Sequence, residues 1–348
     1  MQRYSPEFLT TVTQDVFIAC GSPPGEAAIV AEQLVGNNLM GMDSHGVVRI
    51  PQYVGWVEQG TVKAGAQVSL VEENGGTAVV DCGFNFGQVG GLRAMEIAIT
   101  KAKEYKVACV VTRRCTHVGR LGYFTQIAAE NGMFAMAMVN GCKDVHWVVP
   151  FGGREGRLAT NPISYAVPGV DHPIVSDMAT SMTAEGKVRV HRNRGQMLPE
   201  GWILDADGNP SVDPHDLYGP PHGWILPLGG SAGHKGFALG LLVDLLSGTL
   251  AGDFITEDRP RGTQGVCFIV IDISAFVPTD RFRHLMEDFI SYFKSTPPMP
   301  GVQEVMMPGE VELKTLADRQ KNGIPIESFT WDQIQETAEK LNVEIAEH

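Results

Sequence analysis

The sequence predicts an α/β protein, and three observations support this prediction. From about Gly90 the chain alternates between helical and extended patterns. Its 348 residues are enough for a large core built as two or more lobes. Apolar residues make up 43% and charged residues 19% of the chain, which is an ordinary globular balance and argues against wholesale disorder.

The first part of the chain is predicted to be helical. Helices are expected over residues 6–20 and 24–40, because both carry helical patterns and the strong breaker Ser22-Pro23-Pro24-Gly25 separates them. Residues 68–82 follow with two extended runs, a pattern typical of a hairpin.

The middle and end of the chain predict the remaining elements. Between residues 90 and 139 the expected order is helix 90–105, strand 107–112, helix 121–131 and strand 133–139. Residues 201–222 are rich in Gly, Pro, His and Asp and predict an exposed excursion. The later expected elements are a buried helix over 234–250, a strand over 266–273, and helices over 279–294 and 331–342.

Charge and cysteine usage exclude several classes of function. The formal net charge of −13 argues against a nucleic-acid or anionic-membrane partner, which would need a basic face. The apolar run at 237–250 is interrupted by Asp244 and is too short to span a bilayer. The six cysteines form no C-x-x-C pair and no metal-like spacing with histidine, so we expect reduced thiols, no metal site and a cytoplasmic location.

The segment Ser44-His45-Gly46-Val47-Val48-Arg49 is the first candidate for chemistry. Histidine exchanges a proton near neutral pH, and the planar fork of arginine matches a carboxylate. A protein that holds a small carboxylic acid and moves a proton on it needs this pair. The alternative is a polar loop with an N-cap serine and a surface arginine.

The glycine-rich segments do not form a standard nucleotide motif. No G-x-G-x-x-G follows a strand, and Gly rather than Ser or Thr follows the lysine of Gly229–Gly236, so no P-loop is present. Backbone N–H groups at the start of the helix at 234–250, with Lys235, could still attract an anion. A glycine-rich turn with a solvated lysine is the alternative.

Four further residues stay open when taken alone. His117 lies between a predicted strand and a predicted helix, where α/β proteins often place functional residues. Asp177 could cap the next segment, orient a histidine or bind a ribose hydroxyl. Glu310 and Glu312 could accept hydrogen bonds from sugar hydroxyls or simply face water.

Taken together and in order, these segments resemble the malate/L-lactate dehydrogenase family that is unrelated to Rossmann-type dehydrogenases. Its relatives include ureidoglycolate dehydrogenase, 2,3-diketogulonate reductase, sulfolactate dehydrogenase and Δ1-piperideine-2-carboxylate reductase. The matching segments span nearly the whole chain: Asp43–Arg49, Thr116–Gly119, Pro150–Gly153, Thr160–Pro162, Asp177–Ala179, Gly186–Arg189, Gly233–Gly236, Pro308–Glu310 and Gly323–Pro325.

The resemblance implies a non-Rossmann α/β fold of the L-sulfolactate/malate dehydrogenase type with a mixed sheet. It implies a helical substrate and dimerisation domain built from both chain ends, residues 1–75 plus 295–348, in which the terminal helices pack together. Residues 76–294 would form the NAD(P)-binding domain, with an irregular excursion at 190–225. It further implies a homodimer, with NAD or NADP as cofactor.

The resemblance also implies residue roles. Arg49 would bind the substrate carboxylate, with Ser44 beside it, and His45 and His117 are both candidates for the acid/base. The cofactor contacts would be Asp177, Met178, Ala179, His234, Lys235, Glu310, Glu312 and Cys142. Arg259 or Arg261 would add a second substrate contact.

The function expected from these observations is hydride transfer between NAD(P) and a small 2-hydroxy or 2-oxo acid of the malate/lactate type. The alternatives are a reductase of a cyclic imino 2-carboxylate, a ureidoglycolate-type dehydrogenase, and a non-redox lyase or binding protein on the same scaffold. The sequence leaves open the particular substrate and the choice between NAD and NADP.

Overall fold

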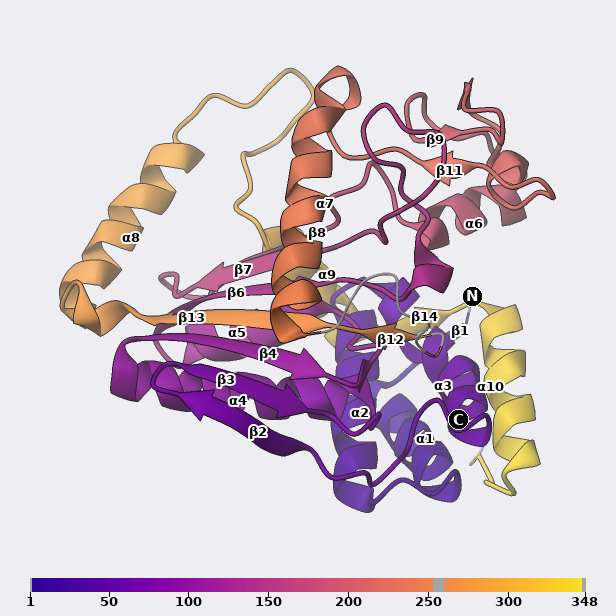
Figure 1. The fold of residues 1–348 in the computed structure, drawn as a ribbon, viewed down its shortest axis with the longest axis horizontal. Helices are drawn as coiled ribbons and strands as arrows, with labels where there is room; N and C mark the ends of the chain where they lie inside the picture. The colour runs from indigo at the N-terminus through magenta and orange to yellow at the C-terminus, as the bar shows by residue number, and fades with distance from the viewer. Residues whose placement is uncertain (1, 253–259, 261, 346–348) are drawn as a thin grey trace.

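The structure is a computed structural model that describes residues 2–252, 260 and 262–345. Among these residues, seven strands form one mixed sheet in the order β2-β3-β4-β13-β6-β7-β8, in which only β3 and β4 are parallel neighbours (Figure 1). The mixed α/β fold is confirmed. The strands are β2 (Ser69–Asn74), β3 (Thr77–Asp81), β4 (Val107–Arg113), β6 (Met133–Val139), β7 (Ile163–Val167), β8 (Ile174–Met178) and β13 (Val266–Asp272).

Helices cover both faces of this sheet. α4 (Gly87–Tyr105) and α5 (Leu121–Glu130) pack on one face, and α7 (Gly233–Ser247) packs on the other (Figure 1). Because side chains alternate along a strand, Val110 of β4 lies in the first core and Val111 in the second. Both faces are therefore apolar, which explains why strands such as 133–139 read as continuous apolar runs.

A third core joins the two ends of the chain. Buried side chains of the N-terminal helices pack with Ile334 and Ala338 of α10, and β1 pairs with β14. The elements are β1 (Gln2–Tyr4), α1 (Pro6–Ala19), α2 (Pro24–Leu39), α3 (Ile50–Glu58), β14 (Ile324–Ile326) and α10 (Ser328–Lys340). The division into domains stays a prediction, and the β2–β3 hairpin crosses the boundary that the sequence placed at residue 75.

The segment at 201–222 is not the exposed excursion that its composition predicted. Ile203, Leu217 and Ile225 are fully buried in a separate small core, which also receives Val188 from α6 (Glu185–Asn193). The strands β9 (Ile203–Leu204), β10 (Pro210–Ser211) and β11 (Trp224–Ile225) form a small sheet there. Its few apolar residues are too widely spaced among turn residues to give a periodic signal.

The helix expected at 234–250 is present as α7, but the prediction that it is buried is wrong. Small residues such as Gly236 and Gly240 face inward, whereas Leu241, Leu242 and Leu245 are 44, 42 and 49% exposed. The few polar residues of this run do not mark the exposed side, because Asp244 and Ser247 are themselves buried.

The next helix also leaves apolar side chains exposed. α8 (Thr279–Lys294) buries only Met286 among its residues. Figure 1 shows α8 standing away from the body of the molecule. No helix of the described residues is long and apolar enough to cross a membrane.

Candidate active site

The loop at 42–49 is held by the last turn of α2. Asn37 Nδ2 donates to the carbonyl of His45 at 3.0 Å, and the backbone N–H of Val47 donates to Asn38 Oδ1 at 2.7 Å. Gly46 lies directly against the Asn38 amide, and a Cβ at this position would lie 2.1 Å from Asn38 Oδ1. The glycine is therefore required by close approach, and the two asparagines fix the course of the loop.

The same loop is attached to the C-terminal part of the chain. Arg319 of α9 (Glu310–Asn322) donates from Nη2 to Asp43 Oδ2 at 3.0 Å and from Nη1 to the carbonyl of Asn38. The sequence predicted a turn with two carboxylates at 308–312, and the structure shows that α9 starts there.

The Arg49 side chain is half-buried and oriented by two hydrogen bonds. Its Nε donates to the carbonyl of Ser44 and its Nη1 to Gln52 Oε1, both at 2.7 Å. No described residue accepts a hydrogen bond from Nη2. Although burial lowers its pKa, a guanidinium stays charged in proteins, so Arg49 presents oriented donors suited to an incoming anion.

His45 and His117 stack face to face, with ring centroids 5.7 Å apart and planes inclined by 11°. His45 Nδ1 lies 3.2 Å from Ser44 Oγ, and His117 Nδ1 lies 2.6 Å from Tyr53 Oη. The structure thus brings together all four predicted catalytic residues. The alternative interpretation required Ser44 to cap a helix, but Ser44 lies inside a short 3-10 turn and caps none.

Both imidazoles are neutral at pH 7. Burial, followed by the positive charge of Arg49, lowers the pKa of His45 to about 3 and lowers the pKa of His117 well below its usual range. Arg120 adds to the effect on His45, and His45 adds to the effect on His117. A neutral imidazole is the form that can accept a proton from a hydroxyl group.

Asp177 caps a helix from a neighbouring strand. Its Oδ2 accepts from the backbone N–H of Gly122 at 2.7 Å, in the first turn of α5 and shortly after His117. Arg120 lies beside it, with Nε 3.9 Å from Oδ2, and burial raises the pKa of the carboxyl. Of the three roles left open by the sequence, the structure shows helix capping, but of α5 rather than of the next segment.

The segment containing Glu310 lies along β8, beside Asp177. The backbone N–H of Val175 donates to the carbonyl of Pro308 at 3.3 Å. Glu310 pairs with Lys294 at 2.7 Å and accepts from the backbone N–H of Met307, whereas the charge of Glu312 raises the pKa of Asp177. Met178 is the last residue of β8 and is exposed, and Ala179 follows the strand.

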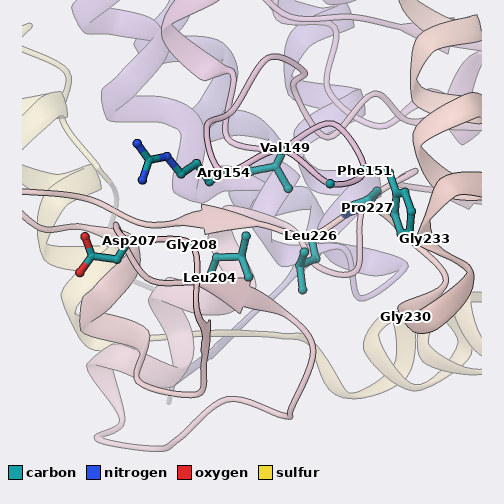
Figure 2. A pocket seen from close by; sticks show the side chains of 12 residues that line it. Val149, Phe151, Arg154, Leu204, Asp207, Gly208, Leu226, Pro227, Gly230 and Gly233 are labelled. Atoms are coloured by element: carbon teal, nitrogen blue, oxygen red, sulfur yellow. The ribbon is translucent and has the colours of Figure 1, made fainter.

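His234 and Lys235 lie elsewhere, exposed in the first turn of α7. The ring of His234 contacts that of Phe151, at a centroid distance of 5.6 Å, next to a cavity of about 420 Å³. Figure 2 shows Phe151 and Pro227 close to Gly233 at this cavity, so the Pro150–Gly153 and Gly233–Gly236 segments meet there. The cavity is lined by none of the four predicted catalytic residues.

Two connections relate these regions. The backbone N–H of Leu228 donates to the carbonyl of Thr180, so the chain leaving Asp177 leads to the start of α7. Cys142 is buried, and its backbone N–H donates to the carbonyl of Thr263 in β12 (Thr263–Gln264), which pairs with β5 (Cys115–Thr116) next to His117. Arg259 and Arg261 lie outside the described residues.

Sequence reasoning missed Tyr53 and Gln88. Gln88 Nε2 donates to Tyr53 Oη at 3.0 Å, and both side chains are 1% exposed. The spacing of Tyr53 four residues after Arg49 was the available signal, since it places both on one face if the chain is helical there. The described residues contain no cluster of His, Cys, Asp or Glu suited to a metal ion.

Comparisons with known proteins identify the family. The pattern of the family described as malate/L-lactate dehydrogenase matches residues 4–335. A malate dehydrogenase from Pyrococcus horikoshii is 37% identical over 339 residues, covering 94% of this chain and 92% of the relative. An L-lactate dehydrogenase from Cupriavidus necator is 34% identical over 340 residues, covering 96% of each.

Solved structures agree with this assignment. A putative malate/lactate dehydrogenase from Escherichia coli has a TM-score of 0.92 at 32% identity, covering 99% of this chain and 96% of that one. A Δ1-piperideine-2-carboxylate reductase from Pseudomonas syringae has a TM-score of 0.85 at 30% identity, covering 97% and 100%.

The fold and the paired histidine and arginine site define an oxidoreductase of the 2-hydroxyacid dehydrogenase class. The chain belongs to the malate/L-lactate dehydrogenase family, as the motifs indicated. Such dehydrogenases imply a nicotinamide cofactor.

We predict that Gly46→Ala disables the site without unfolding the protein. The new methyl group would displace the Asn38 amide and break its bond to Val47, which moves His45 and Arg49. A displacement of about 1 Å can lower kcat/KM by about 100-fold. Gly36→Ala, on α2 close to Asn38 and with nothing within 4 Å of the new Cβ, is the matched control. Equal kcat/KM for the two variants would contradict this account of the loop.

Proposed function

We propose that the chain interconverts small 2-oxo acids and 2-hydroxy acids, with Arg49 binding the carboxylate and His117 exchanging the proton. The observation that carries the proposal is the meeting of an oriented guanidinium with two neutral, stacked imidazoles. When bound, the nicotinamide supplies or accepts the hydride at C2 of the substrate.

Arg49 orients the substrate in this mechanism. Its Nε and Nη1 bonds to Ser44 and Gln52 hold the guanidinium in place, and the remaining N–H groups are available to a carboxylate. Fixing the carboxylate also fixes the adjacent C2 relative to the two histidines.

We assign the acid/base role to His117 rather than His45, because a buried side chain holds the His117 ring in place. The bond between Nδ1 and the buried Tyr53 hydroxyl, at 2.6 Å, fixes the ring and leaves Nε2 for the substrate oxygen. His45 has a longer contact to the exposed Ser44, and its ring, stacked on that of His117, would line the substrate position. In reduction, protonated His117 gives its Nε2 proton to the developing alkoxide, and in oxidation neutral Nε2 takes it back.

Substrate binding would itself adjust this proton exchange. The charge of Arg49 lowers the pKa of His117 in the free protein. A bound carboxylate offsets that charge and raises the pKa of His117, which favours the protonated form needed for reduction.

The start of α7 fits the pyrophosphate of a dinucleotide. Among the described residues, no side chain caps this helix and none pairs with the exposed Lys235. Uncapped N–H groups and a free ammonium form an anion site. Lys235 and His234 would hold the phosphates there, beside the cavity near Gly233.

The remaining cofactor contacts are proposed around β8. Asp177, Met178 and Ala179 would line the path of the cofactor, Cys142 would lie near the nicotinamide, and Glu310 and Glu312 would lie near the ribose. We propose NAD(H) rather than NADP(H), because carboxylates at the ribose would repel a 2′-phosphate.

We predict NADH-dependent reduction of 2-oxo acids by the purified protein. Oxidation of NADH and NADPH, followed by absorbance with pyruvate, oxaloacetate, sulfopyruvate and a cyclic imino acid, should show a higher kcat/KM for an oxo acid and for NADH. A higher value for the imino acid would favour the alternative reductase. Absence of binding of either cofactor in a fluorescence titration would favour a non-redox protein and overturn the proposal.

We predict that Arg49→Ala and His117→Ala separate binding from proton transfer. Arg49→Ala removes the carboxylate contact and should raise KM by more than 10-fold, with a smaller loss of kcat. His117→Ala should lower kcat by about 100- to 10,000-fold. Steady-state kinetics with the best substrate of the panel gives both values. If His45→Ala lowered kcat more than His117→Ala, the assignment would be contradicted, and His45 would be the acid/base.

We propose a homodimer that covers the apolar faces of α7 and α8. Leu285, Phe289, Tyr292 and Phe293 are 45, 48, 75 and 44% exposed on α8, and leucines are exposed on α7. Apolar faces of this extent are typical of subunit contacts, and a second copy supplies a matching surface. Both helices lie within 76–294, so this contact falls outside the end domain to which the sequence assigned dimerisation.

We predict that the protein elutes as a dimer and that Phe289→Glu weakens it. A buried charge at this face opposes association, so light scattering after gel filtration should show a shift to monomer at micromolar concentration. Phe329→Glu is the control, because Phe329 is 72% exposed on α10, which packs on the core built from both chain ends and not on the proposed face. A monomeric wild type, or a dimer that withstands Phe289→Glu alone and with Leu242→Glu, would contradict the proposed face.

We propose the cytoplasm as the location. The support is that the six cysteines are all free thiols in the structure, as reducing conditions would keep them.

A further inference from the structure

Two helices from different parts of the chain converge on the ring of His117. Tyr53 comes from α3 and Gln88 from the first turn of α4, and Tyr53 Oη lies between Gln88 Nε2, at 3.0 Å, and His117 Nδ1, at 2.6 Å. Gly87 permits this approach, since a Cβ there would lie 2.3 Å from the carbonyl oxygen of Thr116. The start of α4 therefore presses directly on the backbone that carries His117.

The direction of these two hydrogen bonds determines which nitrogen of His117 carries the proton. A phenol has one proton. While Gln88 Nε2 donates to Tyr53 Oη, the phenol proton points to His117 Nδ1, and the proton of the neutral imidazole lies on Nε2. In that form Nε2 has no lone pair for a substrate hydroxyl.

The opposite arrangement gives the reactive base. If the Gln88 amide turns by 180°, its Oε1 accepts the phenol proton, and Tyr53 Oη accepts from Nδ1–H of His117. The bare Nε2 then faces the substrate position. Among the described residues Gln88 Oε1 has no hydrogen-bond partner, so the turn breaks no bond made by that atom.

We propose that Tyr53 and Gln88 are positioning residues that select the tautomer of His117, storing the ring as Nε2–H and releasing it as Nδ1–H for oxidation of the hydroxy acid. This inference rests on the proposed role of His117. For the exchange the ring swings away from Tyr53, Nδ1 takes a proton from water to give imidazolium, Nε2 loses its proton to water, and the ring returns with Nδ1–H toward Tyr53 Oη. Tyr53 keeps its proton throughout, because burial raises the pKa of the phenol to about 12.

The charges around the ring explain why a neutral pair suits this task. Burial lowers the pKa of His117 most, Arg49 and His45 lower it further, and no described carboxylate acts on the ring. A carboxylate at Nδ1 would hold one tautomer permanently and raise the pKa of His117. A phenol and an amide can each donate or accept, so they can support either tautomer.

The test compares Gln88→Glu and Tyr53→Phe with wild type and with Tyr123→Phe, a control whose hydroxyl contacts Glu32 away from the ring. A carboxylate only accepts, so Gln88→Glu fixes the Nδ1–H form and should raise the apparent pKa in the pH profile of kcat for oxidation by about one unit or more. Tyr53→Phe should lower kcat at least 10-fold with little change in KM, since the anchor of Nδ1 is lost.

A second measurement reads the tautomer without activity. Nitrogen-15 shifts of labelled histidine, with the His117 signal identified by its loss in His117→Ala, should show Nε2–H in the wild type and Nδ1–H in Gln88→Glu. Unchanged shifts and pH profiles in both variants, with only lower melting temperatures, would overturn the proposal. Full kcat in His117→Ala would instead overturn the role of His117 itself, which distinguishes the two failures.

Discussion

The hydrogen bond between Tyr53 and His117 joins the two cores that supply the active site. Tyr53 packs in the core built from both chain ends, which also positions the loop with His45 and Arg49. His117 lies between Thr116 and Val118, at the edge of the core formed by the sheet with α4 and α5. Since neither core holds all the groups, the site exists only while the two cores stay in contact. The glycines that allow this contact, Gly46 and Gly87, are therefore constrained by the chemistry as well as by the fold.

Several residues without a direct chemical role maintain the same geometry. Asn38 and Arg319 fix the loop on the side of the terminal core, and Asp177 fixes the first turn of α5, shortly after His117. Asp177 lies beside Arg120 and is affected by the charge of Glu312, so a residue proposed to line the cofactor path also has a structural role in capping α5. A loss of activity at such a position therefore reports distorted geometry as well as any lost contact.

The sequence predicted the α/β class, most of the long helices and strands, and the group of Ser44, His45, Arg49 and His117. These features are local, either as periodic patterns or as motifs of a few residues. Tyr53 and Gln88 could not be predicted in the same way, because their partners lie 64 and 35 residues away along the chain. The predictions that α7 is buried and that residues 201–222 are exposed were wrong for a related reason, since burial is a property of the assembled fold.

The local electrostatics of the site oppose the overall charge of the protein and couple binding to chemistry. The chain carries a formal charge of −13, yet the charge of Arg49 acts on both uncharged histidines, and that of Arg120 acts on His45. Burial is the main reason that both imidazoles are neutral, and this positive charge adds to it. In the proposed mechanism, a bound carboxylate offsets the charge of Arg49, so the proton affinity of His117 rises when the substrate binds. A neutral partner such as Tyr53 preserves this response, whereas a charged partner at Nδ1 would set the proton affinity before the substrate binds.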